Sequence, residues 1–209
     1  SRLYKINHFI FASSSSVYGN IKKFPIKEEY NTDFPQSFYA ASKKSNEVIA
    51  FSYSSIYNMP ITGLRFFTVY GPYGRPDMSL FKFTKAMLNN VKLQLFNNGN
   101  HVRDFTYIDD VVESIIKISK KRPKTSIPYS IFNIGSSNPQ KLMKFLKVIS
   151  SNLNIEPKIQ YKSMQKGDVY KTHANVNKLF KEIKFKPKTP INVGIKSFIK
   201  WYKDYYKKN

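Results

Sequence analysis

The segment FIFASSSSVYG, residues 9–19, joins a short apolar run to a row of serines. A continuous apolar run bounded by small polar residues is typical of a buried strand that ends in a loop. In α/β proteins, ligands bind at the carboxyl ends of the parallel strands. We therefore expect a strand at 9–13 whose end carries the polar groups of a functional site.

The elements that follow alternate between helix and strand. We expect a helix at 39–57, with Ile49, Tyr53 and Ile56 on one face and Pro60 ending it, and then a strand at 61–68. The pattern beyond them predicts helices at 79–90, at 110–121 and from about 140, and strands at 91–96, 103–108, 131–134 and 158–161.

Two later helices show helical spacing of apolar residues. The helix at 110–121 opens with the acidic residues 109 and 110, which suit its positive end, and one face carries Val112, Ile115, Ile116 and Ser119. The final helix begins at Thr189-Pro190, a cap residue with proline at the first helical position. Its apolar stripe consists of Ile195, Phe198, Ile199, Tyr202 and Tyr206.

Such alternation predicts an α/β fold with a mainly parallel sheet. A doubly wound sheet needs more strand–helix–strand units than residues 1–60 supply, and no glycine-rich phosphate loop occurs in the 209 residues. We therefore expect only the second half of a Rossmann-type sheet, followed by a smaller α/β region.

The composition limits the class of protein. There is no cysteine, which excludes disulfides and Cys-ligated zinc, and we expect no metal. The apolar runs are too short to cross a bilayer, so we expect no membrane partner. The net charge of +22 would suit a nucleic-acid binder. However, the lysines are spread along the whole chain without a basic block, so we expect solvated faces and no nucleic-acid partner.

The strongest chemical signal is Tyr39-Ala40-Ala41-Ser42-Lys43. Residues four apart on a helix lie on the same face, so the phenol and the ammonium project into one space. A neighbouring positive charge favours the phenolate, which makes the tyrosine a usable general base. The serines at the end of the first strand could hydrogen-bond a substrate alcohol beside it.

Serines before Val-Tyr-Gly, followed by Tyr-x-x-x-Lys, resemble the active-site pattern of extended short-chain dehydrogenases. The segments LRFFTVYGP (64–72), RDFTYIDD (103–110), FNIG (132–135) and QKGDV (165–169) follow in the order found in nucleotide-sugar epimerases. The resemblance covers essentially the whole chain and is closest to UDP-glucuronate 4-epimerases. It places the NAD-binding glycine fingerprint before Ser1.

The resemblance implies a division of the chain. Residues 1–70 would form the C-terminal half of the NAD-binding Rossmann domain, to which segments near 103–135 return. Residues 71–209 would mainly bind the UDP-sugar. The full-length enzyme would be a cytoplasmic homodimer, whereas the 209 residues alone would be inactive.

The resemblance also implies roles at the reacting carbon. Tyr39 would take the proton from the sugar 4-hydroxyl while a hydride passes from C4 to NAD, and the hydride would return to the other face of the 4-keto sugar. Lys43 would hold the nicotinamide ribose, and Ser14 would orient the 4-oxygen. Ser13 and Phe66 would join Tyr39 and Lys43 in binding the cofactor.

The nucleotide and the sugar would be bound elsewhere in the cleft. Arg103 would pair with the diphosphate, since a guanidinium fork suits phosphate geometry. Asp168 would accept from a ribose hydroxyl. The chain near Leu95 and Phe96 would flank the uracil. The remaining substrate-binding residues that the resemblance implies are Ser79, Leu80 and Gln165.

A uronate carboxylate needs an arginine and several hydroxyl groups. Arg75, Thr68, Ser15 and Ser16 could supply them, and Thr68 with the loop at 74–78 resembles the uronate enzymes. A UDP-galactose or UDP-N-acetylhexosamine 4-epimerase is the alternative within the same class. An inactive truncated remnant that only binds its ligands is the alternative outside it.

Overall fold

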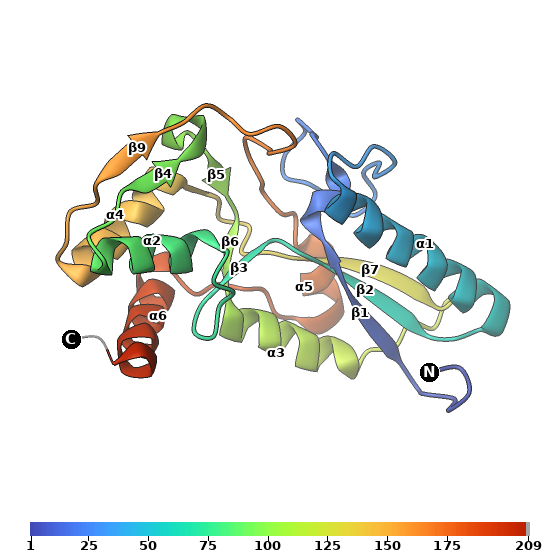
Figure 1. The fold of residues 1–209 in the computed structure, drawn as a ribbon. Helices are drawn as coiled ribbons and strands as arrows, with labels where there is room; N and C mark the ends of the chain where they lie inside the picture. The colour runs from blue at the N-terminus through green and yellow to red at the C-terminus, as the bar shows by residue number, and fades with distance from the viewer. Residues whose placement is uncertain (208–209) are drawn as a thin grey trace.

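A sheet of three parallel strands forms the first part of the computed structural model, which describes residues 1–207 (Figure 1). Its strands are β1 (Phe9–Ser14), β2 (Ile61–Phe66) and β7 (Tyr129–Ile134), in the order β1-β2-β7. The register pairs Ser13 with Arg65 and Arg65 with Asn133. The α/β fold class and the strands expected at 9–13 and 131–134 are confirmed.

Helices cover this sheet on both faces. Helix α1 (Phe38–Tyr57) connects β1 to β2 and packs against them, while α3 (Ile108–Ser119) and α5 (Asn177–Ile183) pack beyond the opposite face (Figure 1). Side chains alternate along a strand, so Leu64 and Phe132 join the cluster of α3 and α5. Phe11 and Arg65 lie on the α1 side.

The second part of the chain surrounds its own apolar cluster. This cluster includes Leu95, Phe145, Ile149 and Phe198, and the rings of Phe105 and Phe145 stack with their centroids 3.9 Å apart. Its helices are α2 (Ser79–Leu88), α4 (Leu142–Leu153) and α6 (Ile191–Tyr206). Two pairs of strands are parallel: β3 (Thr68–Tyr70) with β6 (Phe105–Tyr107), and β4 (Leu93–Leu95) with β9 (Ile159–Tyr161). A third pair, β5 (Val102–Arg103) with β8 (Gln140–Lys141), is antiparallel.

The chain crosses repeatedly between the two parts. Buried Asp104 accepts hydrogen bonds from the backbone N–H groups of Ser136, Ser137 and Ala174, at 2.7, 3.1 and 2.8 Å. Helix α5 comes late in the sequence but packs with the cluster of β2 and β7. The predicted division at residue 70 stays a prediction. In such a division, the segments around Asp104, Ser136 and Ala174 and helix α5 would have to belong to the first part.

Several predicted boundaries are corrected. The strand expected at 61–68 breaks at Phe67. The N–H of Phe67 donates to Ile134 O, whereas the N–H of Thr68 donates to Asp104 O, so the chain changes its pairing partner from β7 to β6. The helix expected from 110 starts at Ile108. Residues 140–141 form a strand before their helix. Pro190 is the cap of α6 and not its first residue, and α5 was not predicted.

Burial on two helices also differs from the sequence pattern. Helix α3 buries Val111, Ser114 and Ile118, whereas Val112 and Ile116 are exposed. Its first turn carries acidic residues, as expected. The predicted face of α6 is buried from Ile195 to Tyr202, while Tyr206 is 42% exposed.

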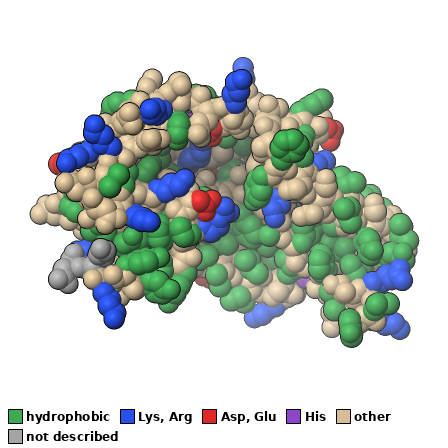
Figure 2. All heavy atoms as spheres, in the orientation of Figure 1, with side chains coloured by type: hydrophobic (Ala, Val, Ile, Leu, Met, Phe, Trp, Pro, Cys, Tyr) green, Lys and Arg blue, Asp and Glu red, His purple; other side chains and the backbone are tan. Residues whose placement is uncertain are grey.

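Basic side chains are spread over the face of the molecule in Figure 2, between apolar and uncharged groups and a few acidic ones. This distribution resembles the spread of lysines along the sequence. No helix within residues 1–207 has the length and apolar character needed to cross a membrane.

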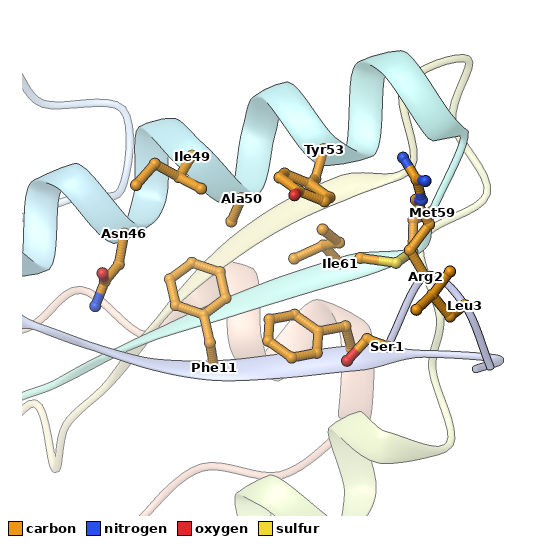
Figure 3. Close-up of a pocket in the computed structure, with 11 residues that line it drawn as sticks. Ser1, Arg2, Leu3, Phe11, Asn46, Ile49, Ala50, Tyr53, Met59 and Ile61 are labelled. Atoms are coloured by element: carbon orange, nitrogen blue, oxygen red, sulfur yellow. The ribbon is translucent and has the colours of Figure 1, made fainter. Parts of the chain in front are cut away.

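The apolar stripe predicted on α1 faces outward. Ile49, Tyr53 and Ile56 are 57%, 44% and 70% exposed, because the face against the sheet carries Ala, Ser and Glu instead. Ile49 and Tyr53 line a hollow of about 790 Å³ between α1 and the edge strand β1. Phe11 lines the same hollow from the side of β1 (Figure 3). An apolar hollow beside an edge strand is a surface on which other chains can pair.

Candidate active site

The serine row is held in a tight turn at the end of β1. Ser14 caps the 3₁₀-helix η1 (Ser15–Tyr18), and its Oγ accepts hydrogen bonds from Ser16 N at 3.2 Å and from Ser16 Oγ at 2.9 Å. Ser14 is 9% exposed, whereas Ser15 and Ser16 are half-buried. The turn therefore places several serine hydroxyl groups at the carboxyl end of the sheet, where the sequence predicted them.

Helix α1 carries Tyr39 and Lys43 one turn apart and close to these serine hydroxyl groups. The helix begins after Ser37, whose Oγ accepts from Ala40 N at 3.1 Å. Lys43 Nζ donates to the carbonyl oxygen of Ala12 at 3.1 Å and lies 5.7 Å from the centroid of the Tyr39 ring. The predicted proximity of phenol and ammonium is found, beside the end of β1.

A cavity of about 570 Å³ opens over these groups. It extends from the end of β1 to the loop that follows β3. Its lining includes most of the residues predicted for catalysis, for the cofactor and for the sugar, namely Ser13, Ser14, Ser15, Tyr39, Lys43, Phe66, Thr68 and Arg75. The structure thus brings together side chains from four separate stretches of the sequence.

A smaller cavity of about 210 Å³ adjoins the first, since Ser15 and Thr68 line both. It is lined further by Ser16, Arg103 and Asp168. The two cavities together place the residues predicted for the reacting sugar next to those predicted for the diphosphate and ribose.

Arg103 and Asp168 contact each other in the smaller cavity. Arg103 Nη2 donates to Asp168 Oδ1 at 2.8 Å, and Nε2 of buried His101 lies 3.0 Å from Asp168 Oδ2. Burial lowers the pKa of His101, with the charge of Arg103 acting in the same direction and Asp168 opposing it. Burial also lowers the pKa of Arg103. His101 was not predicted; only its place two residues before Arg103 could have signalled it.

Arg75 has a partner in the first cavity. Its Nε and Nη2 donate to the two oxygens of Asp77, at 3.0 and 2.6 Å, and both side chains are mostly exposed. This pairing lowers the pKa of Asp77 and raises that of Arg75. A ligand carboxylate at Arg75 would compete with Asp77.

Five predicted substrate residues lie outside the two cavities. Leu80 and Leu95 are buried in the second apolar cluster, and Phe96 is half-buried. Ser79 and Leu80 border a crevice of only about 20 Å³ beside Thr68 and Arg75. Gln165 is exposed. Within residues 1–207 no cluster of three or more His, Asp or Glu side chains could hold a metal ion.

The chain is similar to proteins of one known family. Residues 1–135 match the NAD dependent epimerase/dehydratase family. Protein CapI of Staphylococcus aureus is 49% identical over 100% of this chain and 66% of its own length. UDP-glucuronate 4-epimerase 4 of Arabidopsis thaliana is 41% identical over 94% of this chain and 48% of its own length. The chain thus spans two thirds or less of these relatives.

A solved structure is also similar to this chain in three dimensions. The UDP-glucuronic acid 4-epimerase from Bacillus cereus, in complex with UDP-glucuronic acid and NAD, superposes with a TM-score of 0.89 at 29% identity, over 96% of this chain and 62% of that one. The family match covers more than half of the 209 residues. This chain belongs to the NAD dependent epimerase/dehydratase family.

Proposed function

We propose that the full-length protein is a UDP-glucuronate 4-epimerase that forms UDP-galacturonate. The observation that carries the proposal is the single cavity in which Ser14, Tyr39 and Lys43 meet Thr68 and Arg75. The first three suit proton transfer at a sugar hydroxyl, and the last two suit recognition of the sugar. The relatives named as UDP-glucuronate epimerases support the choice of substrate.

The residues at the end of the sheet fit the nicotinamide end of NAD. Lys43 has donor hydrogens beyond the one it gives to Ala12 O, and Ser13 and Phe66 line the same cavity at the carboxyl edge of the parallel strands. NAD, when bound, supplies an acceptor for the hydride of the sugar C4 and returns it. The glycine loop for its phosphates does not occur among the 209 residues.

The protein's own part in the reaction is a proton transfer. The Tyr39 oxygen takes the proton of the 4-hydroxyl as C4 becomes a ketone, and gives it back when the alcohol forms again. Ser14 orients the 4-oxygen with its hydroxyl. Because the proton and the hydride both return, the substrate and product are isomers and nothing is consumed.

A UDP-sugar with a neutral hexose is the second candidate substrate. The observation that favours it is the bidentate pair of Arg75 and Asp77, which already neutralises the guanidinium. A homodimer and a cytoplasmic location remain parts of the proposal, on the strength of the sequence resemblance.

The test uses the completed chain, by which we mean residues 1–209 preceded by the residues that carry the glycine fingerprint. Incubated with UDP-glucuronate and NAD, it should yield UDP-galacturonate, measured by chromatography. Tyr39→Phe keeps the ring but removes the proton carrier, so it should lose turnover and still bind both ligands. Near-normal turnover by Tyr39→Phe would end the catalytic assignment.

A further inference from the structure

A buried ion pair lies behind the candidate active site. Arg65 Nε and Nη2 donate to the two carboxylate oxygens of Glu47, both at 2.8 Å, and each side chain is 6% exposed. Removing two charges from water costs free energy that their attraction offsets only when the geometry is good. Such a pair is therefore weak evidence for stability, and its contacts indicate another role.

Glu47 also holds the serine turn. Ser13 Oγ donates to Glu47 Oε1 at 2.6 Å, the same oxygen that accepts from Arg65 Nε. The sheet register explains the contact, because Ser13 on β1 pairs with Arg65 on β2 and both side chains point toward α1. Ser13 precedes Ser14 directly, so its hydroxyl fixes the strand end from which Ser14 projects.

On the helix, Glu47 continues the line of the reactive residues. Tyr39, Lys43 and Glu47 follow one another at intervals of four residues, which places them along one side of α1. Lys43 contacts Ala12 O, and Glu47 contacts Ser13. The helix is thus attached to the end of β1 at two successive residues.

Arg65 is itself fixed from two further directions. Its Nη1 donates to the carbonyl oxygen of Glu28 at 3.0 Å, and its guanidinium carbon lies 4.7 Å from the centroid of the Tyr18 ring in η1. The Tyr18 hydroxyl donates to Asn133 Oδ1 at 2.6 Å, on the neighbouring strand β7. The pair therefore joins α1, the three strands and η1 at one point.

We propose that the Glu47–Arg65 pair is a positioning device for the reaction, which holds Tyr39 and Lys43 at a fixed distance from Ser14 through the hydroxyl of Ser13. The inference rests on the proposed function and deepens it. Glu47 and Arg65 act through other residues. A misplacement of about 1 Å at a reacting group can reduce a rate about a hundredfold, so a loosened attachment should reduce turnover.

The first test variant is Ser13→Ala in the completed chain. It removes the contact to Glu47 and leaves the ion pair intact, so the protein should fold. We expect kcat to fall about tenfold while KM for the UDP-sugar changes less than about twofold. Glu47→Gln should act in the same direction and more strongly.

The matched control is Ser54→Ala. Ser54 is fully buried on the same helix, and its hydroxyl has no hydrogen-bond partner within the described residues. The control should leave both kcat and KM unchanged. A kcat of Ser13→Ala within about twofold of the parent, or a loss in KM alone, would overturn the inference.

A second readout does not depend on activity. Hydrogen exchange of the backbone amides at 13–16 and 39–43 should be faster in Ser13→Ala than in the parent, and unchanged in Ser54→Ala. Equal exchange in all three proteins would also overturn the inference. If the completed parent turns over no UDP-sugar, the proposed function fails, and the exchange comparison still decides whether Glu47 holds the turn.

Discussion

Arg103 and Asp168 form a charged hydrogen bond in the lining of the cavity next to the serine turn, with Arg103 Nη2 2.8 Å from Asp168 Oδ1. Arg103 also donates to Tyr170 O at 3.0 Å, which fixes the guanidinium from the same segment. The two residues predicted to bind the diphosphate and the ribose are therefore already arranged relative to each other. An arranged site loses less entropy when its ligand binds.

Arg103→Ala in the completed chain should weaken UDP binding about tenfold or more, because a guanidinium forms charge-assisted hydrogen bonds to phosphate. Calorimetry with UDP measures the change. Lys166→Ala is the control, since it removes the same charge from an exposed position near Asp168. An equal loss in both variants would show that only net charge attracts the ligand.

Arg75→Ala should lower kcat/KM for UDP-glucuronate about tenfold, because the sugar carboxylate loses its partner in a site that remains open to solvent. Activity on UDP-glucose should stay level or rise. Asp77→Asn frees Arg75 from its present partner and should improve the uronate reaction. Equal losses on both sugars in Arg75→Ala would favour the neutral-sugar enzyme.

His101 should make stability depend on pH. Because burial lowers its pKa in the folded state, the unfolded chain binds an extra proton below its usual value of 6.5. The free energy of unfolding of the completed chain should therefore fall as the pH decreases from about 7 to about 5. His101→Gln should flatten this slope in denaturant titrations. Part of it should remain, because burial also lowers the pKa of His8. An unchanged slope in the variant would contradict the assignment.

Residues 1–209 alone should aggregate and bind no NAD. The hollow beside β1 leaves Phe11, Ile49 and Tyr53 on an apolar surface at the edge of the sheet. Light scattering and calorimetry with NAD test the two parts, with the completed chain as the control. Micromolar NAD binding by the 209 residues would mean that the cofactor is held differently from the proposal.

The sequence was sufficient to predict the elements that form the candidate site. Apolar runs identified β1 and β2, and the spacing of Tyr39 and Lys43 was enough to place them together, because both features are local. The burial of α1 could not be predicted, since the face against the sheet consists of small and polar residues that hydropathy does not mark.

Contacts between distant segments were beyond the sequence pattern. The break at Phe67 arises because β2 and β3 pair with different strands, which no local signal reveals. Arg103 and Asp168 were each predicted to face the nucleotide, but their bond joins residues 65 positions apart. Glu47 was not predicted to be part of the site. A single acidic residue on a helix is usually exposed to solvent, and only the structure shows that Arg65 lies beside it.

The late position of α5 in the sequence has a consequence for synthesis on the ribosome. Leu179 and Ile183 complete the apolar cluster around β2 and β7, so the strands leave the exit tunnel well before the helix that covers them. The interior of the sheet can close only once translation has passed residue 183. A nascent chain that stalls earlier should stay open to proteases, and its strands should depend on chaperones until residues 177–183 have emerged.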